Sequence, residues 1–161
     1  MKKLIVGAFA ILMMVFSNQT QAQDYNTGIG LRAGTGLGLT VKHFLNDQAA
    51  LEGLLYTRWG GILITGLYEI HKDIPEVQGL RWFYGGGAHV GAWSASNRNR
   101  PWGGDYGQSY TVVGIDGIIG LDYKFADAPI NLSLDWKPAF NIIGYSGIWG
   151  GDVALSIRYT F

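Results

Sequence analysis

The sequence contains no cysteine, only four prolines, and few charged residues for a chain of 161 residues. Without cysteine the chain forms no disulfide, no thiolate metal site and no lipid anchor on cysteine. Charged residues make up 15% of the sequence, against about 25% in ordinary soluble domains, and the formal net charge is zero. A small soluble domain needs more charge than this to cover its surface, and a neutral chain has no basic footprint for nucleic acid. We therefore expect a surface that meets lipid and no nucleic-acid partner.

Long hydrophobic runs are also absent, apart from residues 4–16 near the N-terminus. This run follows Lys2 and Lys3 and is too short to cross a bilayer as a helix, which needs about 20 residues. The charged start, the short apolar stretch and the small residues Thr20 and Ala22 predict a secretory signal peptide, residues 1–22. The mature chain, residues 23–161, is expected to be one domain. If it lives in a membrane, it must do so as a closed barrel.

What the sequence does contain is a regular alternation of apolar and polar residues, clearest in residues 151–161. Successive side chains of a strand point to opposite faces, so one face of this segment is wholly apolar. Tyr159 and Phe161 end that face, where a bilayer-spanning strand places its interfacial aromatic residues. The segment resembles the C-terminal signal strand of bacterial outer-membrane β-barrels, which closes the barrel and is recognised by the assembly machinery.

Seven earlier segments alternate in the same way, and none shows a convincing helical period. Eight strands is an even number, as in an antiparallel up-and-down transmembrane β-barrel, which is the fold that we expect. The expected strands are 27–33, 37–44, 49–59, 62–71, 80–93, 110–125, 130–142 and 151–161. With a periplasmic C-terminus, the external connections are 34–36, 60–61, 94–109 and 144–150. Pro138 cannot donate a ladder hydrogen bond, so it should mark a bulge or the external end of its strand.

The polar face of these strands carries small residues and a nearly balanced set of charges. A lipocalin-type barrel has the same number of strands but points its apolar residues inward and needs a richly charged exterior. The pattern found here suits a narrow polar lumen, in which ion pairs interlock and leave no open channel. The residues expected in this lumen network are Arg32, Lys42, Glu52, Arg58, Glu69, Arg81, Asp116, Asp122, Lys124, Asp135, Lys137 and Arg158.

Three segments of the last strands, GIDGIIGLDYKF, PINLSLDWKPAF and ALSIRYTF, carry a family resemblance, together with LYEIHK and WFYGGGAHVG before them. They resemble the small OmpA/OmpX-like outer-membrane barrel proteins of Bacteroidota-type bacteria, over essentially the whole mature chain. The resemblance implies a bacterial outer-membrane location, contact with outer-membrane lipid and lipopolysaccharide, and insertion by the barrel-assembly machinery. It implies no single activity, and we expect a monomer with a structural or surface-interaction role.

The histidines raise the question of catalysis. Eight-stranded lipid A deacylases and palmitoyltransferases need a histidine beside a serine and a carboxylate at the outer rim. His43 and His71 map to periplasmic strand ends and are interpreted as interfacial residues. His89 faces the outer half of the lumen, where a hydrogen-bonded network histidine is the simpler interpretation. Its candidate partners for catalysis are Ser94, Ser96 and Asp105. We expect no enzyme, no cofactor and no metal; a lipid-modifying enzyme and a small pore or carrier for apolar molecules are the alternatives.

The longest connection, residues 94–109, supplies candidate binding groups for lipopolysaccharide. Arginines can bind its phosphates and aromatic rings can stack on its sugars. The candidates are Arg98, Arg100, Trp102 and Tyr106, although solvated loop residues are the simpler interpretation. Two aromatic girdles are also expected, one at each end of the barrel. The outer girdle comprises Trp59, Trp93, Trp102 and Trp149, and the inner one comprises Tyr123, Phe125, Tyr159 and Phe161.

Overall fold

The computed structural model describes residues 26–95, 109–144 and 147–161, so the expected signal peptide lies outside the described residues. Ten strands belong to a single antiparallel sheet. Their bounds are β1 Thr27–Gly34, β2 Leu37–Phe44, β3 Ala49–Arg58, β4 Gly61–Asp73, β5 Leu80–Trp93, β6 Tyr110–Lys124, β7 Ile130–Trp136, β8 Ala139–Ile143, β9 Gly147–Trp149 and β10 Val153–Thr160. Among the residues described, no helix is long and apolar enough to cross a membrane.

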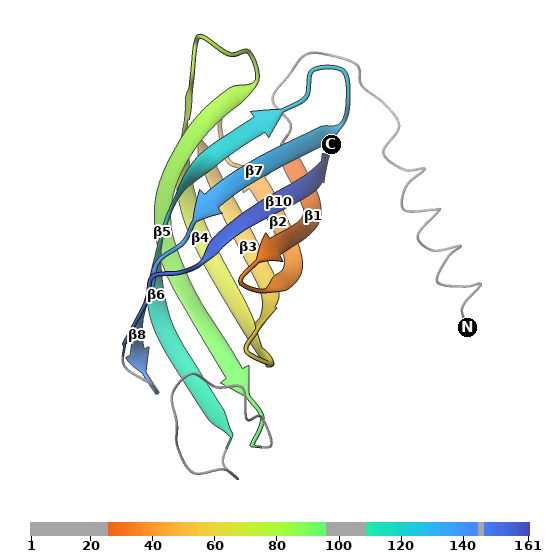
Figure 1. Ribbon diagram of the computed structural model, residues 1–161. Helices are drawn as coiled ribbons and strands as arrows, with labels where there is room; N and C mark the ends of the chain where they lie inside the picture. The colour runs from red at the N-terminus through yellow and green to blue at the C-terminus, as the bar shows by residue number, and fades with distance from the viewer. Residues whose placement is uncertain (1–25, 96–108, 145–146) are drawn as a thin grey trace, which may run out of the picture.

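The sheet closes on itself as a barrel (Figure 1). β1 pairs with both β2 and β10, and β5 pairs with both β4 and β6. β7 and β8 follow one another along β6, and β10 and β9 follow one another along β7 and β8. The ten strands therefore occupy eight positions in the wall. This confirms the expected eight-stranded antiparallel up-and-down barrel.

The strands are strongly tilted, as the hydrogen-bonded register shows. Ala92 of β5 lies directly opposite Thr111 of β6. When the paired residues are followed from Ala92 in the other direction around the barrel, the path reaches Leu121 of β6. Leu121 lies ten residues further along β6 than Thr111. The steps pass through Ile62, Thr57, Leu37, Ala33, Leu155 and Leu134. Such an offset is the shear that a closed barrel requires, and it inclines every strand to the barrel axis.

The wall is interrupted at Lys137 and Pro138, between β7 and β8. The amide of Lys137 donates to the carbonyl of Asp152 over 2.7 Å, and the carbonyl of Pro138 accepts from the amide of Gly117 over 2.9 Å. Proline has no N–H for the ladder, so the expected continuous strand 130–142 is two strands. The expected turn at 144–150 was also wrong in part, because β9 lies within it and forms a hairpin with β8.

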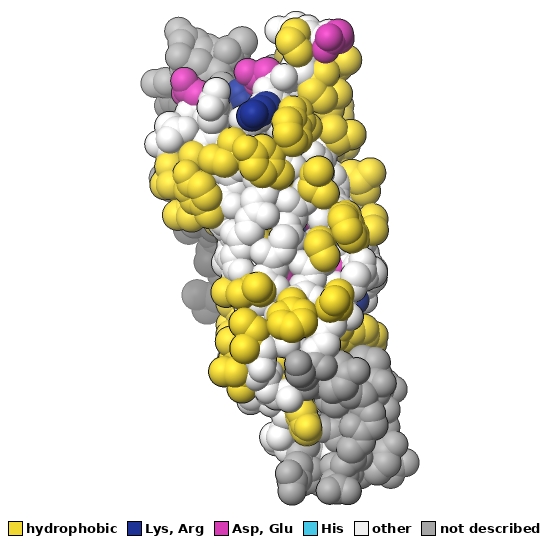
Figure 2. Space-filling model, turned by 90° about the vertical axis from the view of Figure 1, so that its left-hand side faces the viewer, with side chains coloured by type: hydrophobic (Ala, Val, Ile, Leu, Met, Phe, Trp, Pro, Cys, Tyr) yellow, Lys and Arg dark blue, Asp and Glu magenta, His cyan; other side chains and the backbone are white. Residues whose placement is uncertain are grey.

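The two faces of the wall differ in polarity. Apolar side chains point outward; Leu121, Leu134 and Ile157 are 45%, 51% and 48% exposed. Charged side chains such as Lys42 and Glu69 point inward and are fully buried. Figure 2 shows the apolar residues spread over the barrel surface, with the charged side chains mainly near one end. A soluble barrel has the opposite arrangement, so the lipocalin-type alternative is excluded.

Part of the lumen is apolar, which the polar-face interpretation did not anticipate. Leu63 and Leu67, which interrupt the alternation of β4, point inward and are 1% and 2% exposed. They belong to a buried apolar cluster drawn mainly from β3–β6. Its other members are Leu54, Tyr56, Phe83, Trp93, Val112, Ile118, Ala139 and Trp149. The lumen therefore holds a cluster of apolar side chains as well as polar groups.

Glycines on the lumen face allow the wall to curve tightly, and a substitution at Gly85 tests this role. A methyl group at Gly85 would collide with the carbonyl oxygen of Tyr68 and lie 2.9 Å from Cα of Glu69, whereas one at Gly66 would have no heavy atom within 4 Å. We predict that Gly85→Ala lowers the free energy of unfolding by about 1–3 kcal/mol. Gly66→Ala should change it by less than about 0.5 kcal/mol. Urea unfolding of the chain folded in detergent micelles measures both, and equal stability of the two variants would contradict the prediction.

Candidate functional site

The candidate site is the set of charged side chains buried in the lumen. Among the described residues, five cations and six anions are buried. They are Arg32, Lys42, Arg58, Lys137 and Arg158, and Glu52, Glu69, Asp116, Asp122, Asp135 and Asp152. Burying an isolated charge is prohibitively costly, so each of these groups has to find partners inside the barrel. Ten of the eleven fall into two clusters, and Arg58 lies beside the second, with Nη1 4.0 Å from Asp152 Oδ2.

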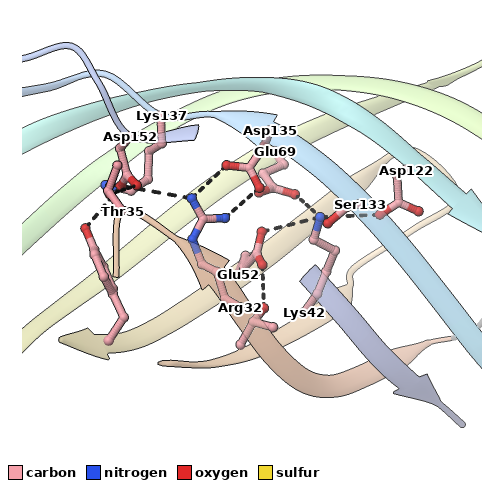
Figure 3. A network of polar contacts seen from close by, with 12 residues as sticks. Arg32, Thr35, Lys42, Glu52, Glu69, Asp122, Ser133, Asp135, Lys137 and Asp152 are labelled. Carbon is pink, nitrogen blue, oxygen red and sulfur yellow. Dashed lines mark hydrogen bonds and ion pairs between the residues drawn. The ribbon is translucent and has the colours of Figure 1, made fainter. Parts of the chain in front are cut away.

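The first group, the Lys42 cluster, comprises Lys42, Glu52, Glu69, Asp122 and Arg158. Nζ of Lys42 lies 2.8 Å from Glu69 Oε2, 3.3 Å from Glu52 Oε2 and 3.6 Å from Asp122 Oδ2 (Figure 3). Arg158 forms an ion pair with Glu52, and its Nη1 lies 4.0 Å from Asp122 Oδ2. Two cations are thus shared among three carboxylates that come from three different strands.

Neutral side chains complete the hydrogen bonding of Arg158. Its Nε donates to Thr40 Oγ1 over 2.9 Å, and its Nη1 donates to Ser133 Oγ over 2.8 Å and to Asn131 Oδ1 over 3.1 Å. The hydroxyl of Thr40 in turn donates to Glu52 Oε1 over 2.5 Å. A buried ion pair is stable only when such additional bonds satisfy its remaining donors and acceptors, and Arg158 meets that condition.

The second group, the Asp152 cluster, comprises Arg32, Asp116, Asp135, Lys137 and Asp152. Arg32 binds Asp135 through two parallel hydrogen bonds, Nη1 to Oδ2 over 2.5 Å and Nη2 to Oδ1 over 2.8 Å. Nζ of Lys137 lies 2.8 Å from Asp116 Oδ1 and 3.3 Å from Asp152 Oδ2. The two-pronged geometry between Arg32 and Asp135 is among the strongest that side chains offer, and it ties β1 to β7, the strands on either side of β10.

Asp152 is a member of the site that the sequence interpretation missed. It lies between β9 and β10, and its Oδ1 accepts a hydrogen bond from Thr35 over 2.7 Å. Its Oδ2 lies 4.0 Å from both Arg32 and Arg58 as well as near Lys137. The signal was present, because the alternation of residues 151–161 places Asp152 on the polar face.

His89 lies in the lumen with both ring nitrogens engaged. Nδ1 is 2.7 Å from Asp116 Oδ2, and Nε2 is 2.9 Å from Asn141 Oδ1. A catalytic histidine needs one nitrogen free to activate a nucleophile, and here that nitrogen faces an amide. Ser94 is exposed, and the other suggested partners, Ser96 and Asp105, lie outside the described residues. The arrangement is that of a histidine within a polar network.

His71 is buried, so its interpretation as an interfacial residue was wrong. Its Nε2 lies 3.0 Å from Glu69 Oε2, and its ring stacks on Phe83 with centroids 4.9 Å apart. His71 therefore extends the Lys42 cluster, a position already marked by its place on the polar face of β4. His43 is exposed, and its Nδ1 lies 2.8 Å from the hydroxyl of Thr27.

Two residues expected in the network lie at the rim. Arg81 is paired with the exposed Asp73, with Nε 2.7 Å from Oδ1. Nζ of Lys124 donates to the backbone carbonyls of Phe125 and Ala128, over 2.8 Å and 2.7 Å. Alternation predicts correctly on which face of a strand these side chains lie, but it does not predict their position along the barrel axis. The loop candidates Arg98, Arg100, Trp102 and Tyr106 lie outside the described residues.

The expected outer aromatic girdle was wrong for the tryptophans that the structure describes. Trp93 and Trp149 point into the lumen and are 1% and 6% exposed. Trp59 packs on Trp149 with ring centroids 5.1 Å apart. At the opposite end the aromatic residues do face outward, as Tyr159 and Phe161 show at 39% exposure each.

The described part of the chain holds no group of three or more His, Asp or Glu side chains arranged to bind a metal ion. No protein-family model matches the sequence, and no curated protein matches it either. Among solved structures, the N-terminal β-barrel domain of OprF from Pseudomonas aeruginosa is similar. Its TM-score is 0.63 at 18% sequence identity, and the match covers 86% of this chain and all of that domain. At this sequence identity, the likeness is one of fold alone.

The bidentate pair of Arg32 and Asp135 makes the network testable. Asp135→Asn leaves the buried Arg32 without its carboxylate, and we predict that it lowers the free energy of unfolding by about 3–5 kcal/mol. The double variant Arg32→Met, Asp135→Leu removes both charges and should recover most of that loss. Asp73→Asn, at the exposed pair with Arg81, is the control and should cost at most about 1 kcal/mol. Urea unfolding measures all three; a loss at Asp135 no larger than at Asp73 would contradict a buried charge network.

Proposed function

We propose that this chain is an integral protein of the bacterial outer membrane that spans the bilayer as a monomeric barrel with a plugged lumen. Its role is structural or surface-interactive and involves no catalysis. The observation that carries the proposal is the polarity of the wall, with apolar side chains outward and charges inward. In water such an exterior would be an aggregating surface, whereas in lipid it is the stable one.

The backbone supports the same environment. Hydrocarbon offers no hydrogen-bond partner, so a β-structure can cross it only as a closed barrel whose strands satisfy one another. Here β1 pairs with β10, and the amide of Phe161 donates to the carbonyl of Thr27 over 2.9 Å while the amide of Thr27 donates back over 3.1 Å. The seam between the first and last strands is thus bonded to the end of the chain. Tyr159 and Phe161 lie beside this seam and are the residues that the barrel-assembly machinery would recognise.

The plugged lumen favours a structural role over a channel. The Lys42 and Asp152 clusters join strands on different parts of the wall through ion pairs of 2.5–4.0 Å. The buried apolar cluster that includes Leu63, Leu67 and Phe83 occupies the same interior. An ion would have to break several buried pairs to pass, so we expect a barrel that does not conduct. Its partners would be outer-membrane lipid and lipopolysaccharide on the outside of the wall.

Arginine substitutions on the two faces of the wall test the membrane orientation. Leu121 and Leu134 are cross-strand neighbours on the outside, and Asp122 is buried beside them on the inside. We predict that Leu121→Arg or Leu134→Arg makes folding into lipid vesicles less favourable by about 2–4 kcal/mol, the cost of a lipid-facing arginine at the bilayer midplane. Asp122→Arg should perturb the Lys42 cluster without placing a charge in lipid. Folding yield into vesicles compared with folding into detergent separates these effects, and equal vesicle-specific losses at all three sites would refute the orientation.

Gel mobility and conductance test the barrel and its plug. A membrane barrel folded in detergent should migrate differently on a gel before and after boiling, with β-rich circular dichroism that requires detergent. A soluble, monodisperse protein without detergent would refute the membrane proposal.

In planar bilayers the folded protein should give no steady conductance, because the lumen is filled by side chains. A steady ohmic pore would refute the plug and favour the pore alternative.

A further inference from the structure

On one side of the barrel the ladder of paired strands stops early, at the end of the β1–β2 hairpin, and we call this place the notch. β4, β5 and β6 are 13, 14 and 15 residues long, whereas β1 and β2 have 8 residues each. The pairing of β10 with β1 ends at Ala154 and Gly34. β9 occupies the same position in the wall beyond that point, and among the described strands it pairs with β8 alone. In Figure 1 the β1–β2 hairpin ends well short of the lower ends of β5 and β6.

Aromatic side chains take the place of the missing backbone. Trp149 of β9 meets Trp59 of the β3–β4 turn edge to face, with ring centroids 5.1 Å apart and planes at 83°. Trp93 packs against Trp149 from within at 5.9 Å. The backbone of Trp59 has a φ of 50°, a left-handed conformation that bulky residues rarely adopt. Side-chain contacts, unlike ladder hydrogen bonds, can open without breaking the wall.

Arg58 lies directly behind this aromatic pair and differs from the other buried arginines. It is 5% exposed, and its guanidinium carbon lies 4.1 Å from the ring centroid of Trp59 and 5.4 Å from that of Trp149. Its Nε and Nη1 have no hydrogen-bond partner within the described residues, because Asp152 Oδ2 is 4.0 Å from Nη1. Arg32, by contrast, donates two hydrogen bonds to Asp135.

Two buried guanidinium nitrogens without a hydrogen bond are costly, and an anionic oxygen would remove that cost. Asp152 is poorly placed to do so, since Lys137 at 3.3 Å and the hydroxyl of Thr35 at 2.7 Å already hold its carboxylate. A ligand that enters through the notch would meet Nε and Nη1 of Arg58 once the rings of Trp59 and Trp149 separate. The group best suited to this guanidinium is a phosphate.

The outer flanks of the notch are the most exposed apolar positions of the barrel. Ile148 of β9 and Leu37 of β2 are 75% and 68% exposed, more than any other large apolar side chain described. They lie on the two strands that border the notch and point away from the lumen. A hydrocarbon chain lying over them would bury apolar surface that none of the described strands covers.

We propose that the notch is a binding site for a phosphate-bearing membrane lipid. Its acyl chain lies over Leu37 and Ile148, and its phosphate accepts hydrogen bonds from Arg58 between Trp59 and Trp149. This inference rests on the proposed function, because a lipid reaches the notch from the side only if the barrel stands in a bilayer. No bond is made or broken in the ligand; the site holds the lipid against the wall.

The test is a titration of the folded full-length mature chain in neutral dodecyl maltoside micelles with dodecyl phosphate. Tryptophan emission should change saturably, because two indole rings flank Arg58, and calorimetry gives the affinity. We expect Arg58→Gln to weaken binding roughly tenfold or more, which corresponds to the loss of one charge-assisted contact. Arg81→Gln is the matched control, since Arg81 lies at the other end of the barrel and pairs with Asp73. It should bind like the unaltered chain.

Each other outcome has a definite meaning. Equal affinity for Arg58→Gln and the unaltered chain would overturn the site. Inorganic phosphate that binds as tightly as dodecyl phosphate would overturn the lipid and indicate a free anion. If the glutamine variant does not fold, Arg58→Lys replaces it, and undiminished binding by that variant would overturn the role of the guanidinium. Boiling-dependent gel mobility is recorded for every variant, so failure of the membrane barrel itself is recognised separately from failure of the notch.

Discussion

The pairing of charges across the lumen is the interaction on which the rest of this structure depends. An eight-stranded barrel is too narrow to hydrate its interior freely, so each inward-facing charge must be neutralised by a side chain from another strand. Arg32 and Asp135 are 103 positions apart in the chain, and Arg158 and Glu52 are 106 apart. These pairs form only when the barrel has closed. They therefore couple the register of the strands to the polarity of the interior.

The exterior follows from the same constraint. Because the polar residues of each strand face the lumen, alternation leaves mainly apolar side chains outside, and the strands from β1 to β7 and β10 are hydrogen-bonded around the closed wall. The likeness to the OprF N-terminal barrel shows that this architecture is shared with another protein at 18% identity. At that identity the likeness covers the fold alone, so the charge pairs of this chain have to be explained from its own residues.

The notch marks the place where the regular wall ends. Pro138 interrupts the ladder between β7 and β8, and among the described strands β9 then pairs with β8 alone. Asp152 and Arg58 lie at this irregularity, where the charge network approaches the outside of the barrel. Trp149 packs there against both Trp59 and Trp93, and these contacts hold Trp93 and Trp149 inward. The irregular part of the wall is thus also the part where large aromatic side chains, and not only polar ones, point into the lumen.

The sequence by itself determined the number of wall positions, the antiparallel barrel and the face of nearly every strand residue, including the inward direction of Glu52, Asp122 and Arg158. Those features are local, because a strand alternates with a period of two wherever it lies. Only the tertiary structure decided which charges meet, that Arg81 and Lys124 remain at the rim, and that His71 and Asp152 join the network. It also revealed β9 and the inward tryptophans. The reason is that height along the barrel and neighbours across the lumen depend on shear and tilt, which are set by all the strands together and by no single segment.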